Sequence, residues 1–256
     1  MKLDSIIRIL LVVCLHYPLF TSISEAQSSG IFNVQIGEVP VEVLPQKAQY
    51  RFADFGWGKV TFMDGQTANA QVNYNLLYGE MQFIDRTKDT LSIADDPIVK
   101  TLTVNDFIFY YDPRYGYVEE VKDFTTCTLA KKQRLRWAKE VQKTTGGAAN
   151  DIMRGTSDNR LSQTSSSWQA NDKQTSQEFF SHSATKPMTF SLRANYYFTD
   201  FNHRWYPANK SSIKKAFRRY KKDVLEFIDT EEIKFNDAQD LIKLLSFCSQ
   251  LKDYNP

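Results

Sequence analysis

The sequence is poor in the side chains that carry most enzyme chemistry. It has 3 His and 3 Cys in 256 residues, although histidine is the usual general base near neutral pH. No Gly-x-Ser-x-Gly turn, Cys-x-x-Cys or His-Glu-x-x-His spacing occurs. Gly146-Gly147 also lacks the Lys-Ser/Thr that completes a phosphate loop. The sequence therefore offers no catalytic residue, and we expect no metal and no cofactor.

Excess charge of one sign is also absent, because the formal net charge is only +2. Such a small value excludes attraction of the whole molecule to nucleic acid or acidic lipid. We therefore expect no nucleic-acid partner. Binding to an anionic partner would have to come from local clusters of basic residues.

Long apolar runs are missing except near the start of the chain. Lys2 and Arg8 are followed by an apolar run from Ile9 to Phe20 and by Ser24-Glu25-Ala26, a pattern typical of a secretory signal peptide. The run is shorter than the about 20 apolar residues of a membrane-spanning helix. We therefore expect a signal peptide over residues 1–26, export of the chain, and no transmembrane span after cleavage.

Two cysteines, Cys127 and Cys248, remain after the expected cleavage. They have two alternative fates in an oxidising compartment: a disulfide or two separate buried thiols. Sequence spacing does not decide between these alternatives.

Period-two alternation dominates residues 50–137. Val60 and Phe62 alternate with polar neighbours, Asp64-Gly65 forms a hairpin turn, and Ala68 to Tyr74 resumes the alternation. Aromatic residues, at 14% of the chain, also favour strands. We predict an antiparallel meander, barrel-like or sandwich-like, that forms a β-rich domain over residues 27–142. Within it, the segment with Pro40 and Pro45 is at best an edge strand.

The composition changes after this domain. Residues 143–188 are rich in Ser, Thr, Gln and Asn, which predicts a flexible polar linker or loop. Residues 189–256 then predict one strand, a helix starting near Ser211-Ser212 and a second helix capped by Asn236 or Asp237. Their apolar stripes are Ile213, Phe217, Tyr220, Val224 and Ile228, and then Leu241, Leu244, Leu245, Cys248 and Leu251. The fold class predicted is α+β, with a C-terminal pair of helices packed on the β-rich domain.

Several segments resemble a known group of proteins. They are Gly58–Val60, Asp64-Gly65, Val72–Leu77, Gly79–Ile84, Asp89–Leu91, Tyr196-Tyr197, Lys214–Phe217 and Asp240-Leu241. The chain is similar, over roughly residues 50–130 and 190–250, to uncharacterised secreted envelope proteins of Bacteroidetes-type bacteria. The resemblance implies export into a Gram-negative envelope, and we therefore expect a location in the periplasm or at the outer membrane. It brings no activity and no site residues.

Two clusters are candidate binding surfaces. The first is a basic segment that contains Lys214, Lys215, Arg218, Arg219, Lys221 and Lys222. It is either a positive strip for an anionic envelope component or protein partner, or a solvated helix face balanced by nearby acidic residues. The second is the turn around Tyr115 and Tyr117, whose rings either stack on a ligand or fill the core.

These observations favour a non-enzymatic binding or scaffold module of the cell envelope. The alternative is a hydrolase that acts on envelope polymers with carboxylates that the sequence does not single out. A concave pocket with converging polar groups distinguishes an enzyme from a binding module.

Overall fold

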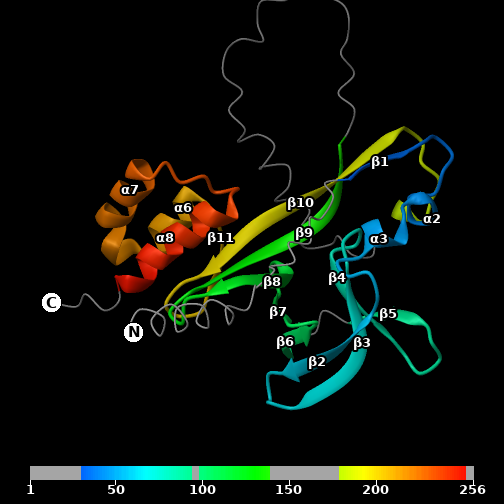
Figure 1. Cartoon of the computed structure of the whole chain (residues 1–256), viewed down its shortest axis with the longest axis horizontal. Coiled ribbons are helices and arrows are strands. Elements are labelled where there is room, and N and C mark those ends of the chain that lie inside the picture. The colour runs from blue at the N-terminus through cyan, green and yellow to red at the C-terminus, as the bar shows by residue number, and fades with distance from the viewer. Residues whose placement is uncertain (1–29, 94–97, 139–178, 252–256) are drawn as a thin grey trace, which may run out of the picture.

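The computed structural model describes residues 30–93, 98–138 and 179–251. These residues form one antiparallel sheet with helices near the C-terminus, which confirms the predicted α+β class (Figure 1). The strands are β1 (Ile31–Val34), β2 (Gly56–Phe62), β3 (Thr67–Asn75), β4 (Glu80–Ile84), β5 (Thr90–Ser92), β6 (Val99–Val104), β7 (Phe107–Asp112), β8 (Gly116–Asp123), β9 (Thr128–Ala138), β10 (Met188–Thr199) and β11 (Trp205–Pro207). The helices are α2 (Pro40–Val43), α3 (Gln46–Gln49), α6 (Lys210–Ala216), the 3₁₀ helix η1 (Arg218–Tyr220), α7 (Lys221–Thr230) and α8 (Ala238–Gln250).

The sheet consists of two meanders joined side by side. Its strand order is β1-β10-β9-β8-β7-β6-β2-β3-β4-β5, and β11 also pairs with β10. The predicted hairpin between β2 and β3 is present: Gly65 has φ +85°, and the amide of Gln66 donates to Asp64 Oδ1 over 2.9 Å. After β5 the chain returns to the free edge of β2, so that β6 starts the second meander.

The long strands β9 and β10 connect two hydrophobic cores. The sheet core contains Val72, Leu102, Phe109, Leu135 and Phe190, and the helix core contains Leu129, Phe198, Phe217, Leu241 and Leu244. Strand β9 continues beyond the end of β8, and there Leu135 N donates to Leu76 O over 2.8 Å. This bond ties the turn between β3 and β4 to β9, so the sheet curls around its core while remaining open at β1 and β5.

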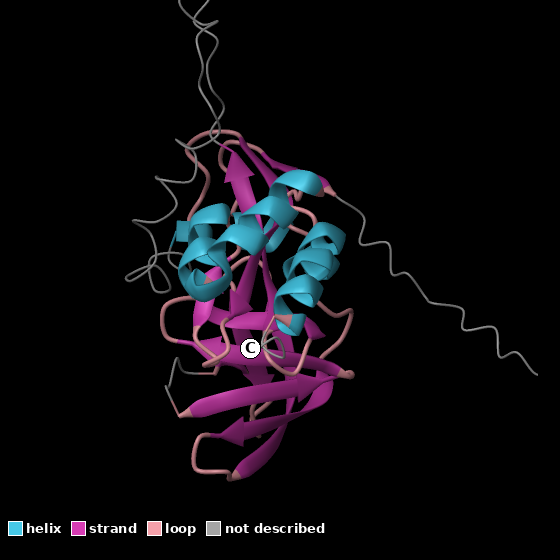
Figure 2. Cartoon of the chain, turned by 90° about the vertical axis from the view of Figure 1, so that its left-hand side faces the viewer, coloured by secondary structure: helices cyan, strands magenta, loops and turns pink. Residues whose placement is uncertain are grey.

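The C-terminal helices α6, α7 and α8 cover one end of the β9–β10 pair (Figure 2). The Asn209 side chain caps α6 by accepting from Ser212 N over 2.8 Å, so this helix begins slightly before the predicted start at Ser211-Ser212. The Asp237 side chain caps α8, as the sequence predicted. The first predicted helix is broken, because Phe217 at φ −104° and ψ 39° ends α6 before η1 and α7 continue.

Three further segments bear on the sequence predictions. The segment with Pro40 and Pro45 forms α2 and α3 instead of an edge strand, because proline fits the first turn of a helix, where no amide hydrogen is needed. The last part of the expected linker, 179–188, is packed: Phe180 and Ala184 lie in the sheet core. Residues 1–26, the expected signal peptide, and 143–178 of the linker lie outside the described residues.

Candidate functional site

The basic segment is divided among three short helical pieces. Lys214 and Lys215 lie in the last turn of α6, Arg218 and Arg219 in η1, and Lys221 and Lys222 at the start of α7. All except the half-buried Lys214 are exposed. Because the chain changes direction at Phe217 and Tyr220, these side chains do not follow one helix face. The Lys215 ammonium lies over the ring of Tyr206, with Nζ 6.0 Å from the ring centre.

The tyrosine turn between β7 and β8 is packed onto the sheet. Tyr117 is 1% exposed and belongs to the sheet core, so it is not available to a ligand. Tyr115 is half-buried, and its ring centre lies 4.7 Å from that of Tyr197 on β10. Lys132 Nζ donates to Tyr115 O over 2.6 Å. The turn therefore lies across one face of β9 and β10.

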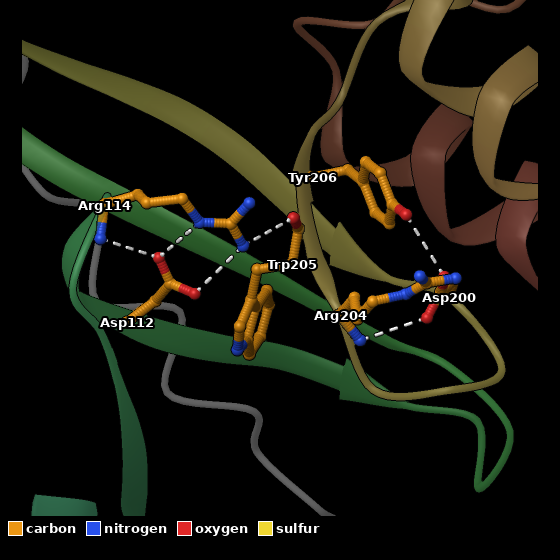
Figure 3. Close-up of polar contacts among 6 residues, drawn as sticks. All are labelled: Asp112, Arg114, Asp200, Arg204, Trp205 and Tyr206. Carbon is orange, nitrogen blue, oxygen red and sulfur yellow. Dashed lines mark hydrogen bonds and ion pairs between the residues drawn. The ribbon is translucent and has the colours of Figure 1, made fainter. Parts of the chain in front are cut away.

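An arginine fixes this turn to the opposite edge of the β9–β10 pair (Figure 3). Arg114 donates to both carboxylate oxygens of Asp112, at 3.2 Å each, and to Trp205 O over 3.1 Å. Its guanidinium carbon lies 5.0 Å from the ring centre of Tyr115. Asp112 is buried, while the Arg114 side chain is 58% exposed. The Arg114 group therefore holds the turn and still presents a cation at the surface.

Asp200 organises the neighbouring turn between β10 and β11. Its carboxylate accepts hydrogen bonds from Asn202 N, from Arg204 N and Nε, and from the hydroxyl of Tyr206 (Figure 3). Burial by itself raises the pKa of Asp200, but the bonds from Arg204 and Asn202 outweigh it and leave the pKa lowered. His203 is exposed on this turn at φ 56°. The carboxylate is thus fully used in holding the turn.

A second group of positive charges lies on strands that the sequence had not singled out. Lys132, Arg134 and Arg136 alternate along β9, and Arg193 on β10 is the direct cross-strand partner of Arg134. Arg136 and Arg193 are exposed, and Lys132 and Arg134 are half-buried. We call these four residues the cationic face.

A tyrosine on β10 indicates how the cationic face is oriented. Burial raises the pKa of Tyr197 to about 12, and the charges of Arg136 and Arg134 oppose this rise. The register agrees, because Tyr197 is the cross-strand partner of Ala130, which lies on the same face of β9 as Lys132, Arg134 and Arg136. Since the Tyr197 ring contacts that of Tyr115 at a tilt of 42°, the cationic face adjoins the tyrosine turn. The structure thus brings Tyr115, but not the basic helical segment, next to a group of cations.

A buried ion network occupies the opposite face of the same strands. Glu119 on β8 accepts from Arg51 Nε over 2.9 Å and pairs with Lys131 Nζ at 3.1 Å. The side chains of Arg51 and Glu119 are 7% and 5% exposed. This carboxylate is held between two cations inside the fold, which is a structural arrangement.

Across 30–93, 98–138 and 179–251, no three His, Cys, Asp or Glu side chains gather as a metal site would require. No helix in that same part of the chain is long and apolar enough to cross a membrane. Cys127 and Cys248 are both buried free thiols. Comparisons with protein-family models, with curated proteins and with solved structures find no match for this chain.

Proposed function

We propose that this chain is an exported, non-enzymatic binding module of the cell envelope, and that its cationic face binds an anionic envelope polysaccharide. The leader pattern of residues 1–26 and the resemblance to secreted envelope proteins support the export. The direct cross-strand pairing of Arg134 with Arg193, beside Arg136 and Lys132, carries the proposal for binding.

The energetics of the pair favour a ligand. Like charges directly opposite each other destabilise a sheet by roughly 0.2–1 kcal/mol. Neither Arg136 nor Arg193 forms an ion pair with another described residue. An anion placed beside Arg136 and Arg193 would reduce the repulsion among the cations and would accept charge-assisted hydrogen bonds from both guanidinium groups.

The arrangement indicates the kind of anion. Three side chains at every second position of β9 form a row, and the spacing of alternate residues along a strand is roughly 7 Å. A row of this kind suits a polymer with repeated charges better than a single small anion. Guanidinium groups bind sulfate, phosphate and carboxylate groups in a bidentate manner. Tyr115 and Arg114, at the end of the row, add an aromatic surface and one more exposed cation.

The test uses dextran sulfate as the anionic probe and uncharged dextran as its partner control. We expect the protein to bind dextran sulfate, with affinity that falls as salt increases, and to ignore dextran. The triple variant R134Q/R136Q/R193Q should bind roughly tenfold more weakly, because ion pairs with two exposed guanidinium groups and one half-buried guanidinium group contribute about 0.5 kcal/mol each. Isothermal titration calorimetry measures both affinities.

A matched variant removes the same number of charges elsewhere. R218Q/R219Q/K222Q neutralises three cations of the basic helical segment, and it should bind dextran sulfate like the unmodified protein. Arg134 packs closely against Gly79, since a Cβ added at Gly79 would lie 2.5 Å from Arg134 Nε. The double variant R136Q/R193Q leaves this contact in place. It should weaken binding in the same direction as the triple variant. Equal losses in the strand and helix variants, or no binding at all, would refute the assignment.

A further inference from the structure

A second surface lies on the strands at the other end of the sheet, in an open groove of about 790 Å³ over β2, β3 and β6. Trp57 lines it with 73% of its surface exposed, the highest value among the large apolar side chains that stand exposed on the described part of the chain. An indole that stays in water on a regular strand contributes nothing to the core. A groove of this volume falls within the roughly 300–1,000 Å³ of small-molecule sites.

The register of the strands sets the polar groups beside this ring. Lys59 lies on β2 two residues after Trp57, so both point to the same side of the sheet. Asn69 on β3 and Thr103 on β6 are the cross-strand partners of Lys59 on its two sides. The floor of the groove is therefore a band of ammonium, amide and hydroxyl groups, with the indole at one end.

The turn between β6 and β7 forms one wall. Asn105 and Asp106 both have positive φ, 47° and 65°, which is the conformation of a tight two-residue hairpin turn. Gly56 lets this turn approach β2, because a Cβ there would lie 2.5 Å from Asn105 Oδ1. Both residues of the turn, Asn105 and Asp106, line the groove together with Trp57.

We propose that this groove binds a ring of an uncharged saccharide by stacking it on Trp57. A sugar ring has an apolar C–H face, which matches the indole face, and an equatorial rim of hydroxyl groups, which match amide, carboxylate and hydroxyl partners. The groove contains one cation, Lys59, and one anion, Asp106, so it does not select a charged ligand. The proposal concerns different strands and a different ligand chemistry from the cationic face, and it does not depend on that assignment.

The test titrates the protein with three neutral hexasaccharides, cellohexaose, chitohexaose and maltohexaose. We expect at least one to bind by calorimetry and to shift the tryptophan fluorescence. Trp57→Ala should weaken that binding roughly 30-fold or more, as expected for the loss of a central aromatic contact. Asn69→Ala should weaken it by a smaller factor.

Met63→Ala is the matched control, because Met63 is 66% exposed just beyond the same strand and does not line the groove. It should leave sugar binding unchanged. Absence of binding to all three sugars overturns the proposal, as does a Trp57→Ala variant that binds as tightly as the unmodified chain. If sedimentation shows a dimer that Trp57→Ala converts to a monomer, the groove is an interface between copies and the proposal also fails. None of these outcomes bears on dextran sulfate binding.

Discussion

The buried pair of Arg51 and Glu119 allows the sharpest prediction of stability. It lies where the β8–β9 region meets the loop before β2, and it is a bidentate pair with distances of 2.9 and 3.3 Å. Lys131 is a second partner of the same carboxylate at 3.1 Å. The Arg51 guanidinium also lies 4.8 Å from the ring centre of Phe107. Glu119→Gln keeps the shape of the side chain but removes its charge.

The expected loss follows from the burial of the pair. A buried cation that loses its carboxylate is left uncompensated in a site of low polarity, which destabilises a protein by about 3–5 kcal/mol. Asp229→Asn is the control, because Asp229 pairs with Lys210 at the surface, with side chains 67% and 47% exposed. An exposed pair contributes less than about 1 kcal/mol. The two isosteric substitutions should therefore differ by at least about 2 kcal/mol.

Urea unfolding followed by far-ultraviolet circular dichroism measures both losses. The double variant R51M/E119L tests the cause, since replacing a whole buried pair by apolar residues is often neutral. We expect it to be more stable than Glu119→Gln, with Lys131, 22% exposed, turning its ammonium toward water. Losses of similar size for Glu119→Gln and Asp229→Asn would refute the reasoning.

Three further predictions concern single buried groups. The Tyr74 hydroxyl is buried without a hydrogen-bond partner among the described residues, so Tyr74→Phe should raise the free energy of unfolding by roughly 1 kcal/mol. Tyr110→Phe should lower the free energy of unfolding by a similar amount, because the Tyr110 hydroxyl donates to the Glu120 carboxylate over 2.5 Å. A Tyr74→Phe variant that is less stable than the unmodified protein would contradict the prediction. Burial raises the pKa of the Cys127 thiol to about 11 and also raises that of Cys248. Iodoacetamide at pH 8 should therefore label neither thiol in the folded protein and both thiols in denaturant without reductant. Unlabelled thiols in denaturant would indicate a disulfide. The folded pKa of Asp200 is lowered, so its contribution is present above the ordinary aspartate value of about 3.9 and is lost as the pH falls through the folded value. Asp200→Asn should therefore reduce stability at pH 7 by roughly 1–3 kcal/mol and weaken its dependence on acid pH, as urea midpoints between pH 2 and pH 7 would show; an unchanged acid dependence would argue against the assigned role.

The sequence predicted the elements whose signals are local. The alternation around Val60 and the Asp64-Gly65 turn predicted the β2–β3 hairpin, and the capping residue Asp237 predicted the start of α8. The buried positions Ile213 and Val224 also followed from helical spacing. Each of these features depends on residues close together in the chain, which is why it is visible in the sequence.

The cationic face and the groove at Trp57 depend on contacts between segments that are distant in the chain. For this reason the sequence did not predict them. The alternation of Lys132, Arg134 and Arg136 on a strand was present in the sequence, but the position of Arg193 beside them follows only from the pairing of β9 with β10. The groove at Trp57 likewise needs β6 beside β2, and these two strands are separated in the chain by β3, β4 and β5. The break at Phe217 divides the basic segment. It was not visible in the sequence, because the helical spacing of apolar residues continues unchanged across Phe217.

Direct mapping of the bound anion on the cationic face is the most decisive measurement. Backbone amide resonances of the protein, labelled with ¹⁵N, would be followed during titration with a short sulfated oligosaccharide. We expect shifts concentrated at Lys132, Arg134, Arg136 and Arg193, with little change over α6, η1 and α7. Shifts confined to those helices, or spread evenly over all exposed basic residues, would contradict it.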